Sequence, residues 1–204
     1  MKQKKKLLIL FHGYGSDGKD LEPIGAFIKE NIPNIDFISP NGFEICNANS
    51  LGFQWFHLSE DRQYIFSEDV KSASIRAFQE FVIHQVKSRD IEVNDVILCG
   101  FSQGGMLALS IGLSMPDKPF LVICLSGLLL DNIDISGKDQ PNILILHGED
   151  DNVLPIDYFN QTLNKLRKLD INFNYKSFKN LSHSISFKEL EYLVEYLKVL
   201  IKDD

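Results

Sequence analysis

The sequence predicts an α/β protein in which helices cover both faces of a mostly parallel central sheet. Short apolar runs of strand length recur along the chain, and most of them are continuous, as in strands that are buried on both faces. Segments with apolar residues at helical spacing separate these runs. Because parallel strands need crossover connections, this alternation predicts right-handed strand–helix–strand units.

The expected elements alternate along most of the chain. The expected strands are residues 7–11, 35–38, 96–99, 120–125, 143–146 and 173–178. The expected helices are residues 20–31, 70–86, 103–114, 156–169 and 187–201. Residues 41–68 interrupt the alternation, because this stretch is rich in Gly, Asn and aromatic residues. Long irregular segments of compact domains are often functional, so we expect an irregular loop here on the substrate side.

Length and composition indicate a single folded domain over residues 1–204. The chain has 44% hydrophobic and 24% charged residues, as is usual for globular proteins. A net charge of −7 argues against nucleic acid as a partner. The apolar run after the first lysines is too short for a signal peptide, and no later segment has the roughly 20 apolar residues of a membrane span. We therefore expect a protein that is not integral to a membrane.

The three cysteines, Cys46, Cys99 and Cys124, form no C-x-x-C pair and no cluster with metal-ligand spacing. Cys99 and Cys124 each end an apolar run, which is typical of small buried side chains. This pattern predicts a cytoplasmic protein without a metal site.

A candidate nucleophile lies in "ILCGFSQGGMLAL", where Gly100, Ser102 and Gly104 form the pattern G-x-S-x-G between an apolar strand and a helix. The pattern alone has little specificity, but its position matches a nucleophile elbow, a strained turn that holds the serine between strand and helix. Glycines on both sides let the two backbones approach each other. Ser102 would then lie at a helix N-terminus, where negative charge is favoured.

A serine nucleophile needs a histidine base, and the chain has five histidines. His183, between the last strand and the last helix, is the natural base. His12 and His147 each precede a glycine after a strand, and we expect them to support those turns. His57 lies in the aromatic loop, where it lines substrate or is solvated, and His84 lies within the long helix.

The acid that orients this base should lie between the serine and the histidine in the chain. "ILILHGEDDNVLP" offers Glu149, Asp150 and Asp151 directly after a buried strand. Spacing alone does not choose among the three carboxylates.

Four motifs together resemble the phospholipase/carboxylesterase family of α/β hydrolases, which includes acyl-protein thioesterases. "HGYGSDG", "GFSQGG", "HGEDDNVLP" and "SHS" occur in the order and at the spacings of that family, and "QWF" resembles its Trp-Phe pair. The resemblance covers residues 7–201. It implies an α/β-hydrolase fold and a serine hydrolase of carboxylic esters or thioesters that forms an acyl-enzyme and needs no cofactor.

The resemblance also implies a role for individual residues. Ser102 corresponds to the nucleophile and His183 to the base. Asp151 corresponds to the orienting acid, because it is the fifth residue from the His of the H-G-x-x-D pattern. The backbone N–H groups of Tyr14 and Gln103 correspond to the oxyanion hole.

Three further residues are expected to line the substrate. Trp55 and Phe56 suggest a lipid-like acyl chain beneath the aromatic loop, although they could equally anchor that loop over the core. Leu128 stands where some thioesterases of the family carry Trp, which bears on the size of the acyl pocket. The expected substrates are small or lipid-like esters and thioesters, with acylated proteins as a further class.

Two other functions are weaker hypotheses. A non-catalytic binding protein is disfavoured because the triad and both glycine turns are present. Residues 13–18 match the dinucleotide fingerprint G-x-G-x-x-G, which would indicate an oxidoreductase. However, Pro23 predicts a helix that starts near residue 20, after Gly18. In addition, Asp17 would repel a pyrophosphate, and Asp36 stands at the wrong end of its strand to bind ribose.

Overall fold

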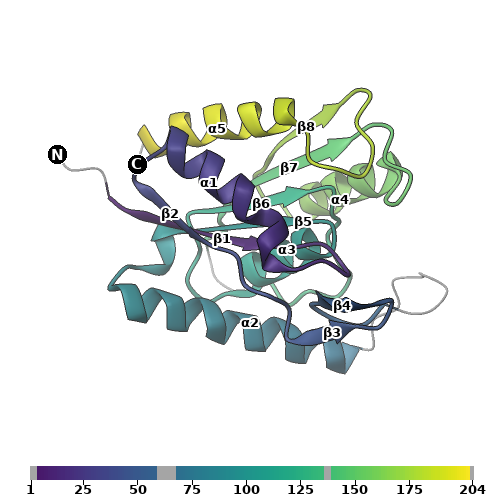
Figure 1. Ribbon diagram of the computed structural model, residues 1–204, viewed down its shortest axis with the longest axis horizontal. Helices are drawn as coiled ribbons and strands as arrows, with labels where there is room; N and C mark the ends of the chain where they lie inside the picture. The colour runs from purple at the N-terminus through teal and green to yellow at the C-terminus, as the bar shows by residue number, and fades with distance from the viewer. Residues whose placement is uncertain (1–3, 59–67, 136–138, 203–204) are drawn as a thin grey trace.

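Six parallel strands form one sheet in the order β2-β1-β5-β6-β7-β8 (Figure 1). The computed structural model describes residues 4–58, 68–135 and 139–202. The strands are β1 (Lys6–Phe11), β2 (Ile35–Ile38), β5 (Val96–Phe101), β6 (Leu121–Leu125), β7 (Asn142–Gly148) and β8 (Asn174–Phe178). The predicted α/β class and parallel sheet are confirmed.

The helices form two layers on opposite faces of this sheet. They are α1 (Glu22–Asn31), α2 (Glu68–Arg89), α3 (Gln103–Ser114), α4 (Ile156–Lys168) and α5 (Phe187–Lys202). Apolar side chains of α1 and α5 share one core cluster, and those of α2, α3 and α4 share the other. Figure 1 shows α1 and α5 together at the top and α2 along the bottom.

Alternating strand residues supply the two clusters, which explains the continuous apolar runs. In β1, Leu7 and Ile9 face the cluster of α2, α3 and α4, whereas Leu8 and Leu10 face that of α1 and α5. Since successive side chains of a strand point to opposite faces, a sheet with helices on both sides needs apolar residues at every position.

The prediction of an irregular loop over residues 41–68 was wrong for part of this stretch. An antiparallel hairpin of β3 (Glu44–Cys46) and β4 (Asn49–Gln54) forms here, and α2 begins at Glu68. The hairpin pairs with the glycine loop through a bridge between Ser16 and Phe53. Its strands are short and largely exposed, so no apolar pattern indicated them. Residues 59–67 of the expected loop lie outside the described residues.

The cysteines are buried and unpaired, as expected for small apolar side chains. Burial raises the pKa of the Cys124 thiol to about 12 and also raises that of Cys99. Both thiols are therefore protonated and unreactive near neutral pH. In the described residues, no cluster of three or more His, Cys, Asp or Glu side chains could hold a metal ion. No helix in this same part of the chain is both long and apolar enough to cross a membrane.

Candidate active site

Ser102 occupies a tight turn between β5 and α3. Its φ of 55° and ψ of −118° are unfavourable for a residue with a side chain. A Cβ on Gly100 would lie 2.1 Å from the carbonyl carbon of Gly104, and one on Gly104 would lie 2.0 Å from the carbonyl oxygen of Phe11. Both glycines are therefore needed, because strand and helix backbones are in contact around the serine.

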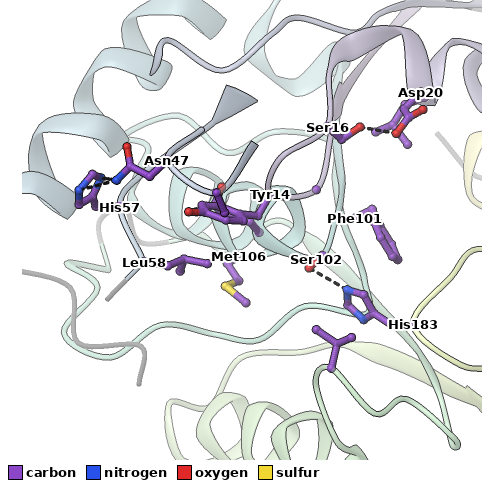
Figure 2. A pocket seen from close by; sticks show the side chains of 15 residues that line it. Tyr14, Ser16, Asp20, Asn47, His57, Leu58, Phe101, Ser102, Met106 and His183 are labelled. Atoms are coloured by element: carbon purple, nitrogen blue, oxygen red, sulfur yellow. Dashed lines mark hydrogen bonds between the residues drawn. The ribbon is translucent and has the colours of Figure 1, made fainter. Parts of the chain in front are cut away.

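His183 lies in the turn between β8 and α5 and faces Ser102 (Figure 2). Its Nε2 is 2.9 Å from Ser102 Oγ, and its Nδ1 is 2.7 Å from Oδ2 of Asp151. The carboxylate can only accept, so Nδ1–H donates to it and Nε2 accepts the serine hydroxyl proton. This tautomer can remove the proton from Ser102.

Asp151 is held in place by the backbone that follows β7. It is only 5% exposed, and its Oδ1 accepts hydrogen bonds from the N–H groups of Val153 and Leu154 at 2.9 and 2.8 Å. Glu149 instead accepts a hydrogen bond from the Ser177 hydroxyl. Of the three adjacent carboxylates left open by spacing, Asp151 is the one within hydrogen-bond distance of His183 Nδ1.

His147 supports this turn from the buried side. Its Nε2 donates to the carbonyl oxygen of Leu154 at 2.8 Å and lies 3.5 Å from Oδ2 of Asp151. Burial lowers the pKa of the His147 imidazole, which keeps the ring neutral near pH 7. The structural role expected for His147 agrees with these contacts.

Two backbone N–H groups lie free beside the serine. A Cβ on Gly13 would lie 3.7 Å from Cβ of Ser102, so the loop after β1 is in contact with Ser102. In the described part of the chain, neither the Tyr14 N–H nor the Gln103 N–H donates a hydrogen bond. Gln103 is the first residue of α3, where N–H groups have no partner within the helix. Both groups are available to an oxyanion.

A cavity of about 900 Å³ opens around Ser102. In Figure 2, Leu58 and Met106 lie on one side of the serine and Phe101 and His183 on the other. A hydrogen-bonded pair, Ser16 and Asp20, also lines it. The remaining lining residues are Gly13, Tyr14, Leu21, Asn47, Ala48, His57, Gln103 and Val153. Such a mixed cavity can hold an apolar acyl group while leaving the serine accessible.

A sequence model of the family described as Phospholipase/Carboxylesterase matches residues 1–201. The chain belongs to the phospholipase/carboxylesterase family. It is 26% identical to Acyl-protein thioesterase 1 of Kluyveromyces lactis, over 97% of this chain and 93% of that protein. It is also 27% identical to Carboxylesterase SOBER1 of Arabidopsis thaliana, over 97% of this chain and 92% of that protein.

Solved structures agree with the fold expected for a phospholipase/carboxylesterase. The crystal structure of esterase PE8 superposes with a TM-score of 0.89 at 31% sequence identity and covers 97% of this chain and 93% of that chain. The fold is therefore that of the α/β hydrolases.

Trp55, Phe56 and Leu128, which were expected to line the substrate of this family member, lie elsewhere. They are 2%, 1% and 7% exposed, belong to the core cluster of α2, α3 and α4, and are not among the described residues that line the cavity. Aromatic content does not reveal which way a loop side chain points, and here the rings turn inward. The next two residues, His57 and Leu58, line the cavity instead.

Met106 is a cavity residue that sequence reasoning missed. It lies four positions after Ser102, one turn further along α3, and therefore on the same side of that helix. This spacing was a usable signal.

In the glycine loop of this phospholipase/carboxylesterase, the N–H groups of Gly15 and Gly18 are already hydrogen-bonded. The N–H of Gly15 donates to the carbonyl oxygen of Phe53 at 2.9 Å, and that of Gly18 donates to Oδ1 of Asn41 at 2.8 Å. Asp17 caps a 3-10 turn, Gly18–Leu21, which precedes α1. The predicted helix start near residue 20 therefore falls within this turn, and the loop has no row of free amides for a pyrophosphate.

Proposed function

We propose that Ser102, His183 and Asp151 are the catalytic triad of this carboxylic ester hydrolase. The observation that carries the proposal is the chain of hydrogen bonds from Ser102 Oγ to His183 Nε2 at 2.9 Å and from His183 Nδ1 to Asp151 Oδ2 at 2.7 Å. A nucleophile bonded to a base that is bonded to an acid is the arrangement that activates a serine hydroxyl.

The reaction proceeds in two steps through an acyl-enzyme. Ser102 Oγ attacks the carbonyl carbon of an ester or thioester while His183 Nε2 takes its proton, and the imidazolium then protonates the leaving alcohol or thiol. A water molecule repeats the sequence on the acyl-enzyme and releases the carboxylic acid. The N–H groups of Tyr14 and Gln103 stabilise the oxyanion in both steps.

Asp151 acts on His183 rather than on the substrate. Its carboxylate is buried and already accepts two backbone hydrogen bonds, so it is held at a fixed position. A fixed carboxylate keeps the imidazole in the tautomer whose Nε2 can accept a proton and stabilises the imidazolium that forms.

The substrates proposed are small or lipid-like esters and thioesters, including acylated proteins. Apolar side chains such as Leu58 and Met106 on the cavity wall suit an acyl chain, and relatives are named both as acyl-protein thioesterases and as carboxylesterases. We further propose a cytoplasmic location, supported by three unpaired, buried cysteines.

Substitution of the nucleophile tests the proposal most directly. Ser102→Ala should lower kcat by about 10⁶ on a p-nitrophenyl ester and should abolish covalent labelling by a fluorophosphonate probe. Retention of either the activity or the labelling by purified, folded Ser102→Ala protein would refute the assignment.

The acid is tested by a pair of adjacent substitutions. Asp151→Asn should lower kcat by about 10⁴, because the amide favours the wrong histidine tautomer. Asp150→Asn is the matched control, since Asp150 is exposed and should leave kcat within about twofold. Equal effects of the two substitutions would contradict the role of Asp151.

A further inference from the structure

The side chains of His12, Trp55 and Gln103, together with the backbone groups that they bind, form a buried hydrogen-bond network near the two free N–H groups. All three residues are 2% exposed or less. His12 directly precedes the loop of Gly13 and Tyr14, and Gln103 directly follows the nucleophile. The network therefore connects the two backbone segments that surround the proposed oxyanion.

His12 binds the peptide group that carries the Tyr14 N–H. Its Nδ1 lies 2.7 Å from the carbonyl oxygen of Gly13, which can only accept, so Nδ1–H is the donor. Its Nε2 accepts the N–H of Gly42 at 3.0 Å. The Gly13 carbonyl and the Tyr14 N–H belong to one planar trans peptide and point in opposite directions. A donor fixed on that oxygen thus fixes the direction of the N–H.

The same contacts keep the His12 ring neutral. Burial lowers the pKa of His12. If Nε2 carried a proton, it could no longer accept the hydrogen bond from the Gly42 N–H, and the two N–H groups would face each other. One tautomer therefore satisfies both partners, and a hydrogen bond to the Gly13 oxygen also polarises the peptide and makes its N–H a stronger donor.

Trp55 connects this peptide segment to the residue after the nucleophile. Its indole N–H donates to the carbonyl oxygen of His12 at 2.6 Å, and its backbone N–H donates to Oε1 of Gln103 at 3.0 Å. Gln103 Nε2 in turn donates to the carbonyl oxygen of Phe56 at 2.7 Å. The indole packs edge-on against Phe78, with ring centroids 4.8 Å apart, so it is anchored in the core.

We propose that His12 and Trp55 are positioning residues for the oxyanion hole, with His12 orienting the Tyr14 N–H and Trp55 fixing its separation from the Gln103 N–H. This inference rests on the proposed function, because it assigns a purpose to those two N–H groups. It gives Trp55 a role in the reaction without contact to the substrate.

Two substitutions of His12 separate this role from a merely structural one. Asn places an amide N–H near the position of Nδ1 and so keeps a donor for the Gly13 oxygen, whereas Gln reaches the position of Nε2 and keeps an acceptor for the Gly42 N–H. Each variant loses the ring and one of the two hydrogen bonds. A structural role predicts similar losses of activity for both.

Positioning of the oxyanion hole predicts unequal losses. His12→Gln should lower kcat/KM for a p-nitrophenyl ester by about 10- to 100-fold, which is below the cost of losing an oxyanion donor outright. His12→Asn should remain at least about fivefold more active than His12→Gln. Equal activities in two folded variants, or a higher activity in His12→Gln, would overturn the inference.

A transition-state analogue supplies the second readout. An alkylboronic acid forms a tetrahedral adduct with a serine hydroxyl, and its Ki should rise by the same factor by which kcat/KM falls. Trp55→Phe removes the indole donor and part of the buried ring but keeps the backbone N–H that binds Gln103, so it provides the test if a His12 variant does not fold. It should lower kcat/KM by about tenfold, and native values of both kcat/KM and Ki would contradict the proposal.

The outcomes also distinguish this inference from the proposed function. If Ser102→Ala is inactive while the His12 pair loses activity equally, only the positioning role fails. If native protein neither hydrolyses esters nor reacts with a fluorophosphonate, the proposed function itself fails.

Discussion

Ser102 is held in a backbone conformation that few residues with a side chain adopt, because α3 must turn away from β5 directly at this residue. This turn places the Ser102 hydroxyl oxygen 2.9 Å from Nε2 of His183. Glycines at 100 and 104 make this turn possible by removing the Cβ atoms that would otherwise overlap neighbouring backbone.

The strain at Ser102 should be measurable as a stability difference between two inactive variants. Ser102→Gly should unfold with a free energy about 1 kcal/mol higher than Ser102→Ala, since relief of an unfavourable φ outweighs the greater freedom of glycine in the unfolded chain. The measurement is urea denaturation of both variants. The control is Ala73→Gly on the exposed side of α2, which should lower stability by about 1 kcal/mol. A Gly variant at 102 that is less stable than the Ala variant would show that the turn is unstrained.

Among the elements, α5 contains a buried carboxyl group that the proposed reaction does not use. Ser186 and Glu189 form reciprocal hydrogen bonds at the start of the helix, as in a capping box. Glu189 is 1% exposed, and its Oε1 has no hydrogen-bond partner in the described part of the chain. Burial raises the pKa of Glu189 to about 7.

This raised pKa predicts a pH dependence of stability that belongs to α5. Glu189 binds a proton more tightly in the folded state than in the unfolded state. Its stabilising contribution to the free energy of unfolding is therefore complete below the unfolded pKa of 4.5 and is lost as the pH rises through about 7. Glu189→Gln keeps an acceptor for the Ser186 N–H without the buried charge. The free energy of unfolding of Glu189→Gln, measured relative to that of native protein, should therefore rise by up to about 3 kcal/mol as the pH increases from 4.5 to 8.

Denaturant unfolding at several pH values tests this prediction, with Glu191→Gln on the exposed side of the same helix as the control. The control should show no comparable gain. A stability difference between Glu189→Gln and native protein that stays constant from pH 4.5 to pH 8 would show that Glu189 titrates normally.

For the whole molecule, the sheet was predictable from sequence because its central strands, β1, β5, β6 and β7, contain continuous apolar runs. β1 and β5 were expected within one or two residues of their observed ends. The β3–β4 hairpin was not predicted, because its stability comes from pairing with the distant glycine loop through Ser16 and Phe53 rather than from an apolar pattern. Tertiary contacts of this kind leave little trace in a local sequence window.

For the candidate site, the sequence predicted the residues with catalytic chemistry but not the direction of the side chains around the cavity. Ser102 and His183 follow from motif context and chain order, and the resemblance to a family was needed to select Asp151 from three adjacent carboxylates. The inward direction of Trp55 depends on hydrogen bonds to His12 and Gln103, which are far apart in the chain. Sequence spacing therefore indicated the chemistry of the site better than the shape of its cavity.

The cavity determines the last prediction, which concerns the length of the acyl group. A space of about 900 Å³ with Leu58 and Met106 on its wall should bury several methylene groups. For p-nitrophenyl esters, which share one leaving group, kcat/KM should rise from acetyl to longer acyl chains by at most about fourfold per buried methylene.

Leu58→Asp should lower kcat/KM for octanoyl ester by about tenfold more than for acetyl ester, because a carboxylate on the wall opposes apolar binding. Leu51→Asp, at a hairpin position that is 89% exposed, should affect both esters equally. A sharp optimum at two carbons in the native enzyme would mean that the acyl group does not occupy this cavity.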